Sequence, residues 1–295
     1  MNPLPIILIH KGNSWYLPYT LYQAHVTNPE SPIYLIGDQD TKHFPKWINH
    51  ISYSQYENYA LKLRDVYQHK SILGKEFELL CIERWFVLHA FLVDKKIGNC
   101  VYLDSDILVY SNLSEAKIIT EGYDATWSGF SAHSNYINNI NALKDYCDNV
   151  IDSYTNNLPS NIKEKTFYYQ RINTTDNKEA ISDMSFWYDY NIRYPERLLN
   201  ISIPNKKGTF DISMEETRFC EDNGYGFKKI YWNQKIPQCK LRDTNHIIPM
   251  ITLHFQGKAK LILKKHFKYW SIRFLLFKIT NDLRILFKKI KHRLK

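Results

Sequence analysis

Short apolar runs and amphipathic segments alternate along the first forty residues. Residues 6–10 and 33–36 are apolar over the length of a strand, and residues 15–27 between them repeat Leu and Ala at helical spacing after Ser14, a candidate helix cap. The links between these segments are short. A strand, a helix and a second strand in this order predict the start of a parallel, right-handed βαβ sheet.

The same kind of pattern continues toward the C-terminus. Residues 75–93 are predicted to form a long helix. The apolar stripe of this helix consists of Phe77, Leu80, Cys81, Trp85, Leu88 and Leu92. Two strand-like stretches are predicted within residues 99–110, on either side of residues 104–106, and further strands over 123–127 and 247–253. Helices are predicted over 135–153 and from about 181 to 188, with Ser182 or Asp183 as candidate caps of the latter. This order predicts an α/β fold with a mixed, mainly parallel central sheet.

Residues 154–180 and the C-terminal residues 263–295 lie outside this alternation. Residues 154–180 are rich in Asn, Thr, Lys and Tyr and have little periodicity, so we expect a variable excursion over a functional site. No internal repeat or low-complexity linker divides the chain. We therefore predict one domain over residues 1–262 and a helical extension over residues 263–295.

The extension is both amphipathic and strongly basic. Its apolar positions fall on one helical face: Ile272, Leu275, Leu276, Ile279, Leu283, Leu286, Ile290 and Leu294. Residues 264–295 carry eleven Lys and Arg side chains against one Asp, which accounts for the net charge of +9. A basic amphipathic helix is typical of a segment that lies in an anionic membrane interface. A packed C-terminal helix with a solvated basic face is the alternative.

Composition excludes several other classes of protein. The remainder of the chain is close to neutral and has no recognition motif, so we expect no nucleic-acid binding. The five cysteines form no CxxC pair and suggest neither a zinc knuckle nor a disulfide framework. No run approaches a membrane span, and the N-terminus lacks the basic region of a signal peptide. We expect a cytoplasmic protein, peripheral on the inner face of a membrane.

Two polar motifs indicate the chemistry. Asp104-Ser105-Asp106 separates two apolar, strand-like stretches, and paired carboxylates at a strand end suit a hard divalent cation that in turn binds a diphosphate. His254, Gly257 and Lys260 follow the last predicted strand. They offer an imidazole for a metal, a close backbone approach to an anion, and a positive charge for phosphate.

Together these motifs resemble those of GT-A-fold, nucleotide-sugar-dependent glycosyltransferases, closest to the type that includes glycogenin and the lipopolysaccharide galactosyltransferases. The DxD motif of that family matches Asp104 and Asp106, and its HxxGxxK motif matches His254, Gly257 and Lys260. The family's basic residue on the helix before the DxD strand corresponds to Arg84, and its later acidic residue to Asp183. Asp38 falls in the family's nucleoside subsite.

The resemblance implies a hexosyltransferase that uses Mn²⁺ or Mg²⁺ and a nucleoside-diphosphate sugar. Asp104, Asp106 and His254 would be the metal ligands, and Lys260 would stabilise the departing diphosphate. Arg84 would hold the donor sugar or Asp104. Asp183 would contact sugar hydroxyls, or act as general base if the enzyme inverts; retention fits the HxxGxxK motif better. The acceptor would be a glycan or a lipid-linked molecule.

Two other functions remain open. Phosphatases of the haloacid-dehalogenase type also use an acid-x-acid motif at a strand end, but that motif lies near the N-terminus, whereas about a hundred residues precede Asp104 here. Leu108 also stands where such enzymes have Thr or Val. A non-catalytic sugar-binding or membrane-associated protein is the second alternative.

Overall fold

Two compact units, each assembled from separate stretches of the chain, make up the computed structural model. The first contains Met1–Ser52, Leu103–Ile119 and Ile201–Lys295, and the second contains Tyr53–Tyr102 and Thr120–Asn200. The structure describes residues 2–38, 44–71, 73–129, 131–156, 181–204 and 208–293. The predicted excursion over 154–180 therefore lies largely outside the described residues, and the predicted boundary after residue 262 remains a prediction.

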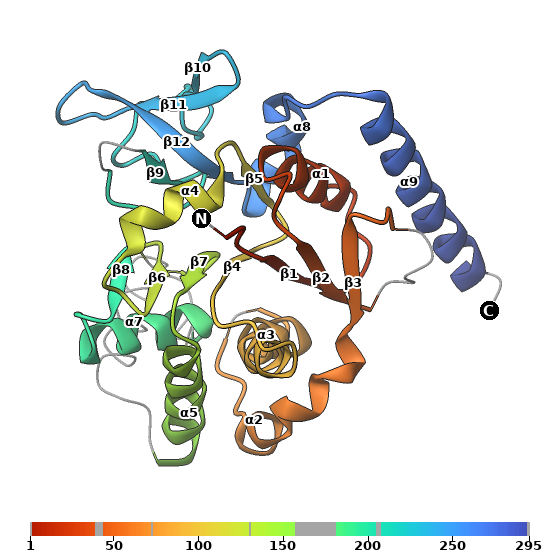
Figure 1. Cartoon of the computed structure of the whole chain (residues 1–295), viewed down its shortest axis with the longest axis vertical. Coiled ribbons are helices and arrows are strands. Elements are labelled where there is room, and N and C mark those ends of the chain that lie inside the picture. The colour runs from red at the N-terminus through yellow and green to blue at the C-terminus, as the bar shows by residue number, and fades with distance from the viewer. Residues whose placement is uncertain are drawn as a thin grey trace. The chain divides into compact units, whose positions relative to one another are not determined.

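A parallel sheet opens the first unit (Figure 1). Its strands are β1 (Ile6–His10), β2 (Ile33–Gly37) and β3 (Ile48–Ser52), in the order β3-β2-β1. Helix α1 (Leu17–Thr27) joins β1 to β2, and these two strands pair in parallel, which confirms the predicted βαβ unit. The predicted cap at Ser14 is wrong, because the helix begins three residues later with a proline in its first turn.

A second sheet of the first unit carries the C-terminal strands. It contains β5 (Ile107–Val109), β9 (Thr209–Phe210), β10 (Tyr231–Asn233), β11 (Ile236–Lys240) and β12 (Ile247–His254). The order is β10-β11-β12-β5, all antiparallel, and β9 pairs with β12 in parallel. The predicted strand over 247–253 is confirmed, and its pairing with β5 decides where its last residue lies.

Short strands and helices make up the described part of the second unit. The strands are β4 (Cys100–Leu103), β6 (Ala125–Trp127), β7 (Ser134–Ile137) and β8 (Leu198–Asn200), in the order β4-β7-β6-β8. The helices are α2 (Leu61–Val66), α3 (Lys75–Asp94), α5 (Ile140–Asn156) and α7 (Asp183–Arg193). Strand β6 pairs antiparallel with β7 and parallel with β8, so the predicted mixed α/β class is confirmed.

Two predictions for this unit need correction. The helix predicted over 135–153 begins only at Ile140, because the buried residues before it pair as β7. The apolar stripe of α3 is also wrong at its start, since Phe77 is 57% exposed whereas Glu83 is buried. Glu83 is stabilised there by an ion pair with Arg64 and by the hydroxyl of Tyr53, 3.1 Å from Oε2. The spacing of hydrophobic residues alone cannot show that a buried glutamate has an ion-pair partner elsewhere in the chain.

The chain ends in the 3₁₀ helix η5 (Gly257–Ile262), the short helix α8 (Leu263–His266) and the long helix α9 (Ile272–Arg293). Helix α9 packs against α1 (Figure 1), and the centre of the Phe274 ring lies 4.9 Å from that of Tyr19. Phe277 contacts the Trp47 ring at 5.5 Å. Among the described residues, no helix combines the length and the apolar character needed to cross a bilayer.

Candidate functional site

The Asp104–Asp106 turn connects β4 to β5, as predicted, and two neighbouring elements of the first unit hold it. His10 at the end of β1 lies with Nδ1 2.8 Å from Ser105 Oγ. Thr20 on α1 donates its hydroxyl to the Ser105 carbonyl at 2.7 Å. The central residue of the turn, Ser105, is therefore held through both its side chain and its carbonyl. Sequence reasoning did not identify His10 or Thr20, because nothing in their spacing links them to the motif.

His254 reaches this turn through strand pairing. It is the last residue of β12 and lies opposite Ile107, the first residue of β5. The next amide, of Phe255, donates to the Asp106 carbonyl at 3.0 Å. An antiparallel register thus brings together two motifs that stand about 150 residues apart in the sequence.

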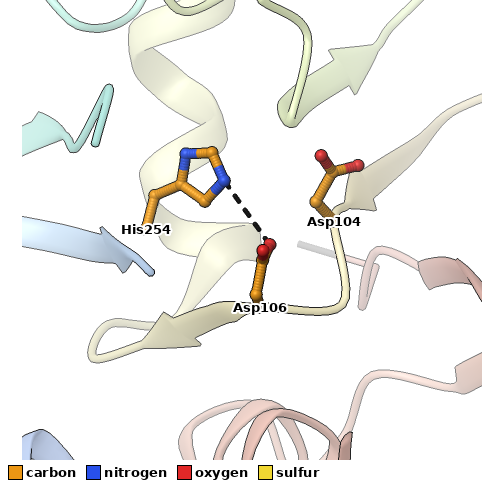
Figure 2. Close-up of side chains that lie close together, drawn as sticks. All are labelled: Asp104, Asp106 and His254. Carbon is orange, nitrogen blue, oxygen red and sulfur yellow. Dashed lines mark ion pairs between the residues drawn. The ribbon is translucent and has the colours of Figure 1, made fainter. Parts of the chain in front are cut away.

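The three candidate metal ligands converge at this point (Figure 2). One ligand atom each from Asp104, Asp106 and His254 lies within 4.8 Å of the other two. His254 Nε2 is 3.4 Å from Asp106 Oδ1, and Lys260 Nζ is 2.6 Å from Asp106 Oδ2. Two carboxylates and an imidazole fit a divalent cation such as Mn²⁺. The predicted metal ligands and Lys260 are thus brought together.

The electrostatics of the cluster favour an ionised carboxylate. Burial would raise the pKa of Asp106, but the charges of His254 and Lys260 outweigh burial and hold that pKa well below its usual range. Conversely, burial would lower the pKa of His254, and the Asp106 carboxylate raises it. Positive groups thus compensate Asp106 in this structure, and a bound cation would take over part of that role.

A neighbouring segment clamps His254 on its backbone and its ring. The His254 amide donates to Asp211 Oδ2 at 3.0 Å, and the Met214 amide donates to the His254 carbonyl at 2.9 Å. The ring nitrogen Nδ1 lies 2.7 Å from the Ile212 carbonyl. Since a carbonyl only accepts, Nδ1 carries the hydrogen and Nε2 faces the cluster.

Asp211 is held by a buried cation, Lys228. The two side chains form an ion pair in which Asp211 is 1% and Lys228 5% exposed. Lys228 Nζ also donates to the Ser213 carbonyl at 2.9 Å. Sequence reasoning missed both residues, because a single Asp and a single Lys in a segment of mixed pattern give no signal before the fold pairs them.

Gly257 and Asp38 lie in the same unit and make contacts of their own. Gly257 adopts a φ of +55°, and a Cβ added there would lie 2.9 Å from Glu215 Oε1. That same oxygen accepts the Ala259 amide at 3.0 Å. The backbone of the HxxGxxK segment is thus held by the carboxylate of Glu215. Asp38 follows β2 and accepts the Gly12 amide at 2.7 Å.

Arg84 and Asp183 meet within the second unit. Arg84 Nη2 lies 2.6 Å from Asp183 Oδ2, and the Trp85 indole donates to the same oxygen at 3.2 Å. Asp183 is the first residue of α7, whose predicted cap at Ser182 is confirmed by a capping box. The guanidinium of Arg84 also lies over the Trp85 and Tyr102 rings at 5.2 and 5.5 Å. Asp183 is therefore a well-held buried carboxylate.

Glu78 accompanies this pair and was not predicted. It is 1% exposed, and Ser71 donates to its Oε2 at 3.0 Å. Burial, together with the negative charge of Asp183, raises the pKa of Glu78 to about 7. The carboxyl of Glu78, which lies near Asp183, therefore titrates near neutral pH.

We predict that Glu78 makes the folded protein less stable as the pH rises from about 4.5 to about 7. In that range the unfolded chain releases the proton while the folded chain keeps it, so raising the pH favours unfolding, by up to about 3 kcal/mol. Glu78→Gln removes this dependence. Urea unfolding at pH 5 and pH 8 measures it. Glu76→Gln, exposed on the same helix, is the control, and identical pH dependences of wild type and Glu78→Gln would refute the assignment.

Comparison with known proteins gives structural likeness at low identity. No family model matches the chain, and no curated protein matches it. Similar solved structures include galactosyltransferase LgtC with donor and acceptor sugar analogs (13% identity, 93% of this chain and 95% of that one, TM-score 0.45). Mouse xyloside xylosyltransferase 1 is another, with 11% identity over 68% of this chain and 85% of that one and a TM-score of 0.44. The glycosyltransferase GlyE of Streptococcus pneumoniae has 14% identity over 68% of this chain and 45% of that one and a TM-score of 0.34.

Proposed function

We propose that the protein is a metal-dependent hexosyltransferase that moves a sugar from a nucleoside-diphosphate sugar to a glycan or lipid-linked acceptor. The observation that carries this proposal is the convergence of Asp104, Asp106 and His254, with Lys260 beside them. An ionised carboxylate, a second carboxylate and an imidazole whose Nε2 faces them form a donor set for Mn²⁺ or Mg²⁺. When bound, the ion supplies charge stabilisation for a departing diphosphate.

The protein's own residues have separate tasks in this proposal. Lys260, whose pKa is raised by Asp106 against the opposite effect of burial, stays protonated and places a fixed positive charge beside the phosphates. Gly257 allows the backbone to approach them, and Asp38 contacts the nucleoside. In the second unit, Arg84 orients Asp183, which accepts hydrogen bonds from hydroxyls of the donor sugar. We propose transfer with retention of the anomeric configuration.

A panel of nucleoside-diphosphate sugars tests the proposal. We expect hydrolysis or transfer with one donor in the presence of Mn²⁺, loss of turnover with excess EDTA, and recovery when Mn²⁺ is added back. NMR of the product then gives its anomeric configuration. Binding of a sugar without turnover of any donor would favour the non-catalytic alternative, whereas release of phosphate from simple phosphomonoesters would favour the phosphatase.

We further propose that the C-terminal extension, residues 263–295, places this enzyme on the inner face of an anionic membrane. Among the described side chains of helix α9, those of Phe274, Phe277 and Asn281 are buried. The apolar residues that remain exposed are Ile272, Leu275, Leu276, Ile279, Leu283, Leu286, Phe287 and Ile290. An exposed apolar face on a basic helix suits an interface of acidic lipid headgroups. The exposed face of α9 therefore favours a helix that packs on the protein with one side and contacts a membrane with the other.

We predict that Leu276→Gln/Leu283→Gln weakens binding to vesicles containing phosphatidylglycerol by at least about tenfold, since each exposed Leu loses its apolar contact with the membrane. Co-sedimentation at low and high salt measures this, and salt should weaken wild-type binding as well. The control is Ile236→Gln/Ile247→Gln, which changes exposed apolar residues of β11 and β12. Equal losses in the two double variants would contradict a role of α9.

A further inference from the structure

A second group of positively charged side chains lines a cavity of about 250 Å³ in the first unit. Asn223 and Lys229 come from the chain before β10, and Trp232 comes from β10 itself. Lys265 and His266 belong to α8, and Lys268 follows that helix. None of the candidate metal ligands lines this cavity, so it is distinct from the cluster around Asp106.

The charge of this cavity is only partly compensated. Lys229 Nζ pairs with Glu221 Oε1 at 2.8 Å, and Lys228 pairs with buried Asp211. Within the described part of the chain, neither Lys265 nor Lys268 has a carboxylate at ion-pairing distance, and no acidic side chain lines the cavity. Two ammonium groups therefore remain available to an anion.

The aromatic part of the cavity wall is well packed. Lys268 Nζ lies 4.0 Å from the centre of the Trp232 ring, which also contacts Tyr110 at 5.7 Å and His266 at 6.1 Å. His266 is buried, and burial followed by the charges of Lys265 and Lys268 lowers its pKa, so its ring is neutral at pH 7. The cavity thus combines lysine ammonium groups with a packed aromatic wall.

We propose that this cavity binds the phosphate group of a phosphate ester. Ammonium groups and the Asn223 amide supply hydrogen-bond donors, and two uncompensated positive charges match a phosphate dianion better than a single carboxylate. The Trp232 ring offers an apolar surface to the organic part of the ester. This inference does not depend on glycosyl transfer.

Such a phosphate has two possible sources, which a titration can separate. A lipid headgroup is one candidate, because Lys268 lies only four residues before α9, whose apolar face is exposed. If acyl chains strengthen binding, the lipid headgroup is the source. A water-soluble phosphate ester is the source if they do not. Calorimetric titration of the full-length protein with glycerol 1-phosphate, and with dihexanoyl phosphatidic acid below its micellar concentration, supplies both arms.

We expect wild type to bind at least one probe and Lys265→Gln/Lys268→Gln to bind it at least about tenfold more weakly, as two charge-assisted contacts are lost. The matched control is Lys235→Gln/Lys240→Gln, which removes the same charge from β11 and the turn before it without changing the cavity lining. Thermal unfolding checks that both variants are folded. The inference is overturned if neither probe binds, or if the two double variants lose affinity equally.

Discussion

Asp106→Asn is expected to lower metal-dependent donor turnover by at least about a thousandfold while the protein stays folded. Asp106 provides a candidate ligand atom, pairs with Lys260 at 2.6 Å and lies 3.4 Å from His254 Nε2. Its amide isostere keeps the shape but removes the charge on which these contacts depend, and the loss of electrostatic stabilisation at a reacting diphosphate has effects of this size.

Steady-state rates with the active donor across a Mn²⁺ titration measure this effect. Circular dichroism and thermal unfolding establish that the variant is folded, and Asp243→Asn on an exposed turn is the matched control. Turnover within a few-fold of wild type would show that the cluster is not the catalytic centre. Restoration of full turnover by high Mn²⁺ would restrict Asp106 to a contribution to metal affinity.

Breaking the buried pair of Asp211 and Lys228 is expected to have the second-largest effect. Lys228→Met leaves the Asp211 carboxylate buried without its cation, which costs about 3–5 kcal/mol of stability. Because Asp211 also accepts the His254 amide, the variant should bind Mn²⁺ about 10–100-fold more weakly. Chemical unfolding and direct Mn²⁺ titration measure the two effects separately.

A double-mutant cycle distinguishes a positioning role from general destabilisation. Asp211→Asn/Lys228→Met should be less destabilised than the sum of the single variants, since neither buried charge is then left alone. Lys228→Arg keeps the charge and should recover much of the Mn²⁺ affinity. If Mn²⁺ binding stays unchanged in every variant that is folded at the assay temperature, the pair has only a structural role.

The residues that converge in the candidate site could be picked out from the sequence, but the residues that hold them in place could not. Asp104, Asp106, His254 and Lys260 carry their chemistry in residue type and local spacing, so the sequence indicated them before any fold was known. Asp211, Lys228 and Glu78 have ordinary local contexts. Their roles follow from burial and from partners that are distant in the chain, and no periodicity records either property.

The hydrophobic pattern by itself determined the elements with a strong signal. These are the βαβ opening of Ile6–Gly37, the long helix α3, the strand β12 and the amphipathic helix α9. Each is a long or clearly apolar segment whose length and spacing favour one type of secondary structure. The short strand β7 and the start of α5 were not determined, because four residues are too few for a period to emerge.

Tertiary structure alone decided what surrounds the Asp104–Asp106 motif and which side of α9 is buried. Pairing of β12 with β5 brings His254 to Asp106, and contacts with α1 and Trp47 bury Phe274 and Phe277 while the predicted apolar face stays exposed. Local sequence specifies the residues that suit a cation or an interface. Long-range pairing and packing decide which of them meet, because these depend on contacts between segments that the sequence separates.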